Sequence, residues 1–170
     1  AETFRALMRQ HREHVGFAHG RLRDFHPQLR LCRAVAIVRN PWARVASRYQ
    51  FGLQVIRAGK APPGYNFRSF DEFLEDRHRW GSEPFYWHRA VRGWYEQLDY
   101  VVDEGGNIAC DILRTELLTS ELTRYFGRAP DRRHNVTLGA QPYRMLYNAR
   151  QIQIVADWYS RDIEVFGFDF

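Results

Sequence analysis

Residues 34–49, AVAIVRNPWARVASRY, are the stretch of sequence that decides the fold. The first five form an uninterrupted apolar run, short and partly β-branched, which is typical of a strand covered on both faces in a parallel sheet. Asn40 can then cap a helix, and Pro41 suits its first position because it lacks the N–H that would be left unpaired there. We therefore predict a buried strand over residues 34–38, a tight turn and a long helix.

The rest of the chain follows the same alternation of apolar strands and amphipathic helices. The long helix carries one apolar stripe at steps of three and four residues, made of Trp42, Val45, Ala46, Tyr49, Leu53 and Ile56. We predict further helices over residues 3–14, 69–75 (capped by Ser69 with Glu72), 85–97, 116–126 and 152–166, a turn at 105–107, a second strand over 108–113 and a loop over 128–141. Strands that alternate with helices indicate an α/β fold with a parallel central sheet.

Composition indicates one compact domain over residues 1–170 with a cationic surface. The chain is 45% hydrophobic, enough for a sizeable core, and carries 25 basic against 20 acidic residues. Lys60 is the single lysine, so the positive charge is almost wholly guanidinium, a group suited to phosphate, sulfate or carboxylate. We see no nucleic-acid-binding signature, no membrane segment of roughly 20 apolar residues, and no paired cysteine motif around Cys32 or Cys110.

Arg39 and Ser47 are the candidate anion ligands. An arginine at the end of a buried strand, just before a helix, lies beside backbone N–H groups and the positive end of the helix dipole. Ser47 lies two turns into the helix, off the apolar stripe and nearest in azimuth to Arg44, so its hydroxyl can donate to the same bound group. The spacing therefore predicts an anion-binding site.

The pattern R-[DN]-P-x-x-R-x-x-S-x-Y over residues 39–49 resembles the 3′-phosphate-binding motif of sulfotransferases that use 3′-phosphoadenosine 5′-phosphosulfate. It is most similar to the carbohydrate and heparan-sulfate 2-O branch and its bacterial relatives. Three more segments resemble the family in the same order: DILRTELL over 111–118, HNVT over 134–137 and YSRDIEVFGF over 159–168. The resemblance thus extends from about Thr3 to the end of the chain.

The resemblance implies a P-loop NTPase-like three-layer fold with a parallel central sheet, in which Arg39 and Ser47 hold the 3′-phosphate and no metal is needed. Family members also carry a Gly-rich loop of the form K-T-x-G-T-S, whose lysine and N–H groups cradle the 5′-phosphosulfate. Residues 1–4 correspond to the end of that loop, with Thr3 as its last hydroxyl residue and Glu2 at a position usually held by a small or hydroxyl residue. We interpret the missing first strand and loop as a truncation, with a degenerate member of the family as the alternative.

The implied reaction transfers a sulfuryl group to a hydroxyl acceptor, a carbohydrate or small molecule, with histidine as the general base. His14, in a segment that resembles the family's H-V-x-x-x-x-x, is our candidate, with His11 and His19 as rivals. A metal site at His11 and His14 lacks a further ligand nearby. We expect the cytoplasm of a bacterium as the compartment, with the Golgi lumen as the alternative.

Three other interpretations compete with the sulfotransferase. A kinase-like or nucleotide-hydrolysing P-loop protein would need a Walker lysine and a magnesium carboxylate, and neither is visible. A degenerate sulfotransferase-like module would lack catalysis, and an arginine-rich module would bind polyanions through surface charge, with affinity that collapses in salt.

We interpret Arg132, Arg133 and His134 as a solvated charge run. The aromatic residues Tyr65, Phe67, Trp80, Phe85, Tyr86 and Trp87 either pack in the core or stack on an acceptor ring. The acceptor and the oligomeric state are not specified by the motif.

Overall fold

The computed structural model describes residues 21–24, 33–61, 64–80, 94–128 and 141–170, and it is a mixed α/β structure that is mostly helical. The chain divides into two compact units, each built from segments far apart in sequence. The first combines Ala1–Arg39 with Gln97–Val136, and the second combines Asn40–Glu96 with Thr137–Phe170. The boundary between the units falls inside residues 34–49, between Arg39 and Asn40.

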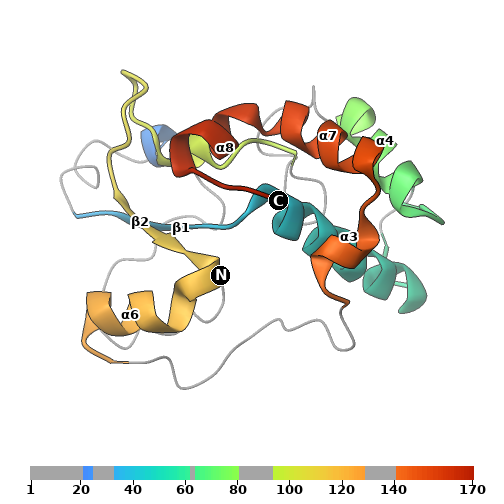
Figure 1. Cartoon of the computed structure of the whole chain (residues 1–170), viewed down its shortest axis with the longest axis horizontal. Helices are drawn as coiled ribbons and strands as arrows, with labels where there is room; N and C mark the ends of the chain where they lie inside the picture. Colours follow the sequence, from blue (N-terminus) through green and yellow to red (C-terminus); the bar gives the residue numbers. More distant parts are fainter. Residues whose placement is uncertain (1–20, 25–32, 62–63, 81–93, 129–140) are drawn as a thin grey trace. The chain divides into compact units, whose positions relative to one another are not determined.

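The first unit contains a parallel pair of strands, β1 (Val35–Val38) and β2 (Asp111–Arg114), which run side by side in Figure 1. The register pairs Val35 with Asp111 and Val38 with Arg114, so both strands end at the same edge. The predicted strand at residues 34–38 and the parallel pairing are confirmed. The second strand begins three residues later than predicted, because Ile108 instead forms an antiparallel bridge with Val102 across the turn at residues 103–107.

Helix α6 (Leu118–Phe126) packs against β2 and covers the sheet from one side. Leu113 of β2 and Leu122 of α6 form a small buried cluster, against which Val35, Ile37, Leu118, Tyr125 and Phe126 pack. The helix ends at Gly127, whose φ of 75° lies in the left-handed region that favours glycine. The predicted helix over residues 116–126 is confirmed except for its start, which is a 3-10 turn, η3 (Thr115–Leu117). Two short elements, η1 (Leu22–Asp24) and α5 (Leu98–Val101), complete the described part of this unit.

The second unit is built around the long helix α3 (Pro41–Arg57), which begins where the sequence predicts. Asn40 caps it: the side-chain Oδ1 accepts a hydrogen bond from the N–H of Ala43 at 3.2 Å, and Pro41 occupies the first position. The buried part of the predicted stripe is its N-terminal half, with Trp42 and Val45 at most 4% exposed. The helix packs against α7 (Ala149–Trp158) and the 3-10 turn η4 (Tyr143–Leu146).

Helix α4 (Phe70–Trp80) is five residues longer than predicted. Ser69 accepts a hydrogen bond from the N–H of Glu72 at 3.2 Å, as a capping box requires, while the Glu72 carboxylate binds the N–H of Arg68. Its continuation past residue 75 has a tertiary cause, because the Arg77 guanidinium lies over the Trp158 ring at 5.6 Å. Packing against α7 thus extends a helix that its own sequence pattern ends earlier.

The single final helix predicted over residues 152–166 is wrong, because the structure has two helices there. It consists of α7 and α8 (Ser160–Phe166), drawn in red in Figure 1, with Tyr159 between them at φ −115° and ψ 31°. Tyr159 is 0% exposed, as its place in the apolar repeat of the predicted helix indicates, so the break changes the backbone and not the buried face. The end of α8 at Gly167, with φ 61°, is as predicted.

The predicted helix over residues 85–97 is wrong at its end, where residues 94–97 form bends and the next helix starts only at Leu98. Trp94 and Gln97 are both buried there and are oriented by distant partners, which overrides local helical preference. Residues 81–93, like the predicted helix at 3–14, lie outside the described residues.

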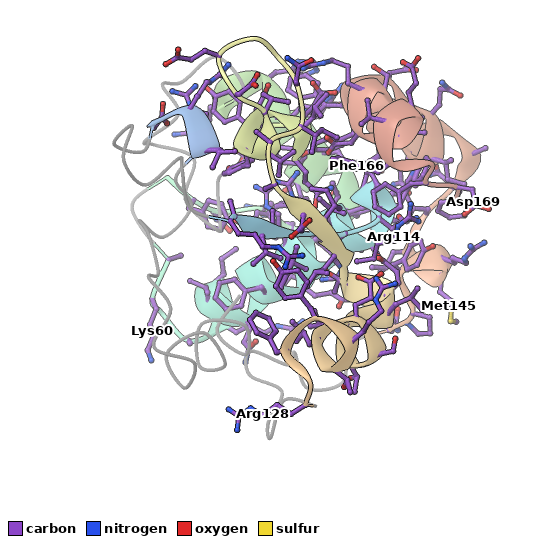
Figure 2. All side chains as sticks on the ribbon, turned by 90° about the vertical axis from the view of Figure 1, so that its left-hand side faces the viewer. Lys60, Arg114, Arg128, Met145, Phe166 and Asp169 are labelled. Atoms are coloured by element: carbon purple, nitrogen blue, oxygen red, sulfur yellow. The ribbon has the colours of Figure 1, made fainter. Side chains whose placement is uncertain are left out.

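In the part of the chain that the structure describes, no helix combines the length and apolarity needed to cross a lipid bilayer. Figure 2 shows Lys60 and Met145, the latter 73% exposed, pointing away from the ribbon.

Candidate functional site

Arg39 directly follows β1, at the carboxyl end of the parallel pair. Gln97 holds its backbone at two points: its side-chain Oε1 accepts from the Arg39 N–H at 2.8 Å, and its Nε2 donates to the Arg39 carbonyl at 2.7 Å. Gln97 is 8% exposed, so this double hydrogen bond is shielded from water. These two hydrogen bonds hold the Arg39 backbone just after β1 and thereby fix the point from which the Arg39 side chain extends.

The carboxyl edge of the sheet carries further polar groups within the first unit. The Thr115 hydroxyl donates to the Val38 carbonyl at 3.0 Å, and the N–H of Arg114 donates to the Glu121 carboxylate. Val38 and Arg114 are partners in the register, so the residues that follow both strands lie at one edge. In α/β sheets this edge is where ligands commonly bind.

In the second unit, the first turn of α3 is anchored by three long-range hydrogen bonds. The Asn40 side chain, which caps the helix, also donates through Nδ2 to the carbonyl of Asp169 at 2.6 Å. The Trp42 indole donates to the carbonyl of Ile152 at 3.0 Å, and the Tyr147 hydroxyl donates to the Trp42 carbonyl at 2.8 Å. The start of α3 is therefore held both by α7 and by the C-terminal segment.

Ser47 lies two turns into α3 and is half-buried. Its role as a ligand of the anion stays a prediction. Arg44, one turn earlier, is used structurally: its guanidinium donates to the Tyr95 carbonyl at 2.8 Å and lies over the Tyr159 ring at 5.5 Å. The predicted neighbour of Ser47 thus makes contacts inside the unit.

Arg48 and Tyr159 form part of the site environment that sequence reasoning missed. The Arg48 guanidinium lies over the Trp94 ring at 4.6 Å, and Tyr159 and Asp162 are both 0% exposed. Burial raises the pKa of the Tyr159 hydroxyl, and the nearby Arg44 and Arg48 charges partly oppose that rise. The local signal for this arrangement is the i, i+4 spacing of Arg44 and Arg48, which places both arginines on one face of the helix.

The predicted site residues fall into three groups. Arg39 belongs to the first unit and Ser47 to the second, so their surroundings belong to different units. His14 and Thr3 lie outside the described residues, as do His11, His19 and residues 132–134. Of the aromatic residues considered for an acceptor, Tyr65 and Phe67 are at most 5% exposed and pack in the core. Within the described ranges, no three His, Cys, Asp or Glu side chains gather in a way that could hold a metal ion.

Comparison with known proteins gives no match: no protein-family model, no curated protein and no solved structure matches this chain.

Proposed function

We propose that this chain is part of a sulfotransferase with a P-loop NTPase-like three-layer fold, in which Arg39 and Ser47 bind the 3′-phosphate of 3′-phosphoadenosine 5′-phosphosulfate. One observation carries the proposal. Arg39 directly follows a strand of a parallel pair, and the very next residue caps a 17-residue helix that carries Ser47. Backbone N–H groups and the helix dipole favour a phosphate at such a strand-to-helix turn.

Arg39 suits the role of anchor because its backbone is held independently of its side chain. Both Arg39 backbone groups are bonded to Gln97, so the guanidinium projects from a fixed point. A guanidinium presents two parallel N–H donors to phosphate oxygens, which a lysine cannot do. Ser47 contributes one hydroxyl donor from the helix. Together they account for recognition of a dianionic phosphate on the ribose without a metal.

The proposed reaction is an in-line displacement at sulfur. A bond forms between the acceptor oxygen and sulfur, the bond from sulfur to the 5′-phosphate oxygen breaks, and the nucleotide leaves as adenosine 3′,5′-bisphosphate. His14 accepts the proton of the acceptor hydroxyl, which is a carbohydrate or small-molecule alcohol, and Thr3 donates to the phosphosulfate. Arg39 and Ser47 hold the nucleotide so that catalysis comes mainly from positioning.

The binding part of the proposal is tested by isothermal titration with adenosine 3′,5′-bisphosphate. Arg39→Ala should weaken Kd by about 10- to 100-fold, the range for a hydrogen bond to a charged group. Because the two hydrogen bonds from Gln97 join backbone atoms of Arg39, this substitution leaves both in place. Arg57→Ala, at an exposed site in the last turn of α3, is the matched control and should leave Kd unchanged.

Two results would contradict the proposal. One is a Kd that does not respond to Arg39→Ala or to Ser47→Ala. The other is equal affinity for adenosine 2′,5′-bisphosphate and the 3′,5′ isomer, with binding that collapses as salt is raised. That second result would favour an arginine-rich module that binds polyanions through surface charge.

A further inference from the structure

Two of the arginines of helix α3, Arg44 and Arg48, are four residues apart on the face that turns toward buried aromatic rings. Arg44 lies over Tyr159 at 5.5 Å, and Arg48 lies over Trp94 at 4.6 Å and over Phe73 at 6.0 Å. All these residues belong to the second unit, so the contacts are internal to it. The arginines are thus packed inside the unit, at positions where a surface helix normally places its solvated charges.

The environment of the two guanidiniums is unusual because it holds few water-exposed groups. Tyr159 and Asp162 are 0% exposed, and Trp94 is 2% exposed. Asp162 and both arginines act electrostatically on the Tyr159 hydroxyl, so the four polar side chains form one local network.

The network also ties together the segments on either side of α3. Arg44 donates to the Tyr95 carbonyl at 2.8 Å, and the Trp158 indole donates to the Trp94 carbonyl at 2.9 Å. Residues 94–95 are therefore held between α3 and the end of α7. Ser47 lies between Arg44 and Arg48 in sequence, so its rotation about the helix axis depends on both.

We infer that Arg48 is a positioning residue for Ser47: its stacking on Trp94 sets the rotation of α3 and thereby aims the Ser47 hydroxyl at the bound phosphate. This inference rests on the proposed function. A planar guanidinium can stack on an indole ring, whereas a lysine ammonium keeps the charge but loses the planar contact. Arg48→Lys should therefore preserve the charge of the network and release the constraint at the turn of α3 that carries Ser47, while the hydrogen bonds of the first turn stay in place.

The test is a double-mutant cycle on Ser47 and Arg48, measured by isothermal titration of the full chain with adenosine 3′,5′-bisphosphate. In the parent chain Ser47→Ala should weaken Kd by about tenfold. In the Arg48→Lys background the same substitution should change Kd by less than about threefold, because the hydroxyl is already misaligned. The control background is Arg57→Lys on the same helix, where the full tenfold effect should return.

The outcomes distinguish a failure of the proposed function from a failure of the inference about Arg48 alone. If the parent chain does not bind the nucleotide, the proposed function fails and the inference with it. If the parent binds and Ser47→Ala costs the same in both backgrounds, Arg48 has only a general structural role and the inference alone is wrong. Should Arg48→Lys unfold the chain, as circular dichroism would show, Trp94→Phe replaces it. That variant shrinks the ring on which the Arg48 guanidinium lies and should reduce the Ser47 effect in the same direction.

Discussion

Arg33 of the first unit and Arg48 of the second differ in how far water reaches their surroundings. In the first unit, Arg33 has a side chain that is 76% exposed and pairs with Asp111 at 2.7 Å, with the Tyr125 hydroxyl bonded to the same carboxylate oxygen at 2.8 Å. In the second unit, Arg48 lies against Trp94, which is 2% exposed. Water and salt screen the first pair, whereas the aromatic packing shields the second. The comparison teaches that residue type alone does not tell a structural arginine from a solvated one.

The hydrophobic cores of the two units differ in the kind of side chain that forms them. The first unit is centred on two leucines, Leu113 and Leu122, under a two-stranded sheet. The second contains a continuous group of rings in contact: Tyr49, Tyr65, Phe67, Phe70, Phe73 and Trp94. Aromatic side chains bury more area each than aliphatic ones and prefer specific geometries. Changes in the second unit should therefore have the larger energetic effects.

The largest effect is expected for Phe73→Ala. Phe73 is 0% exposed and contacts the rings of Tyr49, Phe67 and Trp94 at centroid distances of 5.0–5.6 Å. We expect a loss of about 3–5 kcal/mol in the free energy of unfolding, measured by urea denaturation. Phe51→Ala, at a side chain that is 40% exposed, is the control and should cost far less. Equal losses at the two sites would remove the distinction between the aromatic core and the surface.

An intermediate effect is expected for Gly52→Ala in the middle of α3. A Cβ at Gly52 would lie 2.6 Å from Cζ of Phe67 and 2.8 Å from Oη of Tyr65, and both rings are buried. Alanine favours a helix, but overpacking against fixed rings costs about 1–3 kcal/mol, so we expect a lower Tm. Gln54→Ala, two residues further at an exposed position, gains less helix propensity but makes no clash and should not lower Tm. A higher Tm for Gly52→Ala would mean that these rings move easily.

The smallest effect is expected at the exposed ion pair of the first unit. Hydrogen bonds from Arg33 and Tyr125 hold the pKa of Asp111 below its ordinary value. A carboxylate with a lowered pKa stabilises the folded state at pH above the unfolded-state pKa, and this contribution disappears as the pH falls through the lower folded-state pKa. The difference in unfolding free energy between the parent and Asp111→Asn should therefore be greatest near neutrality and vanish in acid. A difference that grows as the pH falls below about 4 would contradict this assignment.

Several local features of the fold could be predicted because their causes lie within a few residues. The strand at 35–38 is a short apolar run, Asn40 caps α3 through the N–H of a residue three positions on, and Gly127 and Gly167 end helices with positive φ. The errors have distant causes. Trp94 and Gln97 make long-range contacts where the sequence predicts a helix, and the extension of α4 follows from its packing against Trp158. Of the candidate site, the sequence predicts Arg39 and Ser47, and their joint role stays a proposal.

The amino-acid sequence by itself determined the strand, turn and helix around Arg39, because caps, apolar runs and proline act over one turn of chain. Only the tertiary structure decided what holds that arginine and its neighbours in place. Gln97 binds the Arg39 backbone from 58 residues away, and Trp94 packs on Arg48 from 46 positions further along the chain. Such contacts depend on which surfaces meet after folding, and a glutamine or tryptophan carries no local sign of its distant partner. Local hydrogen bonding can therefore be predicted from the sequence, whereas the residues that position the candidate ligands emerge only from packing.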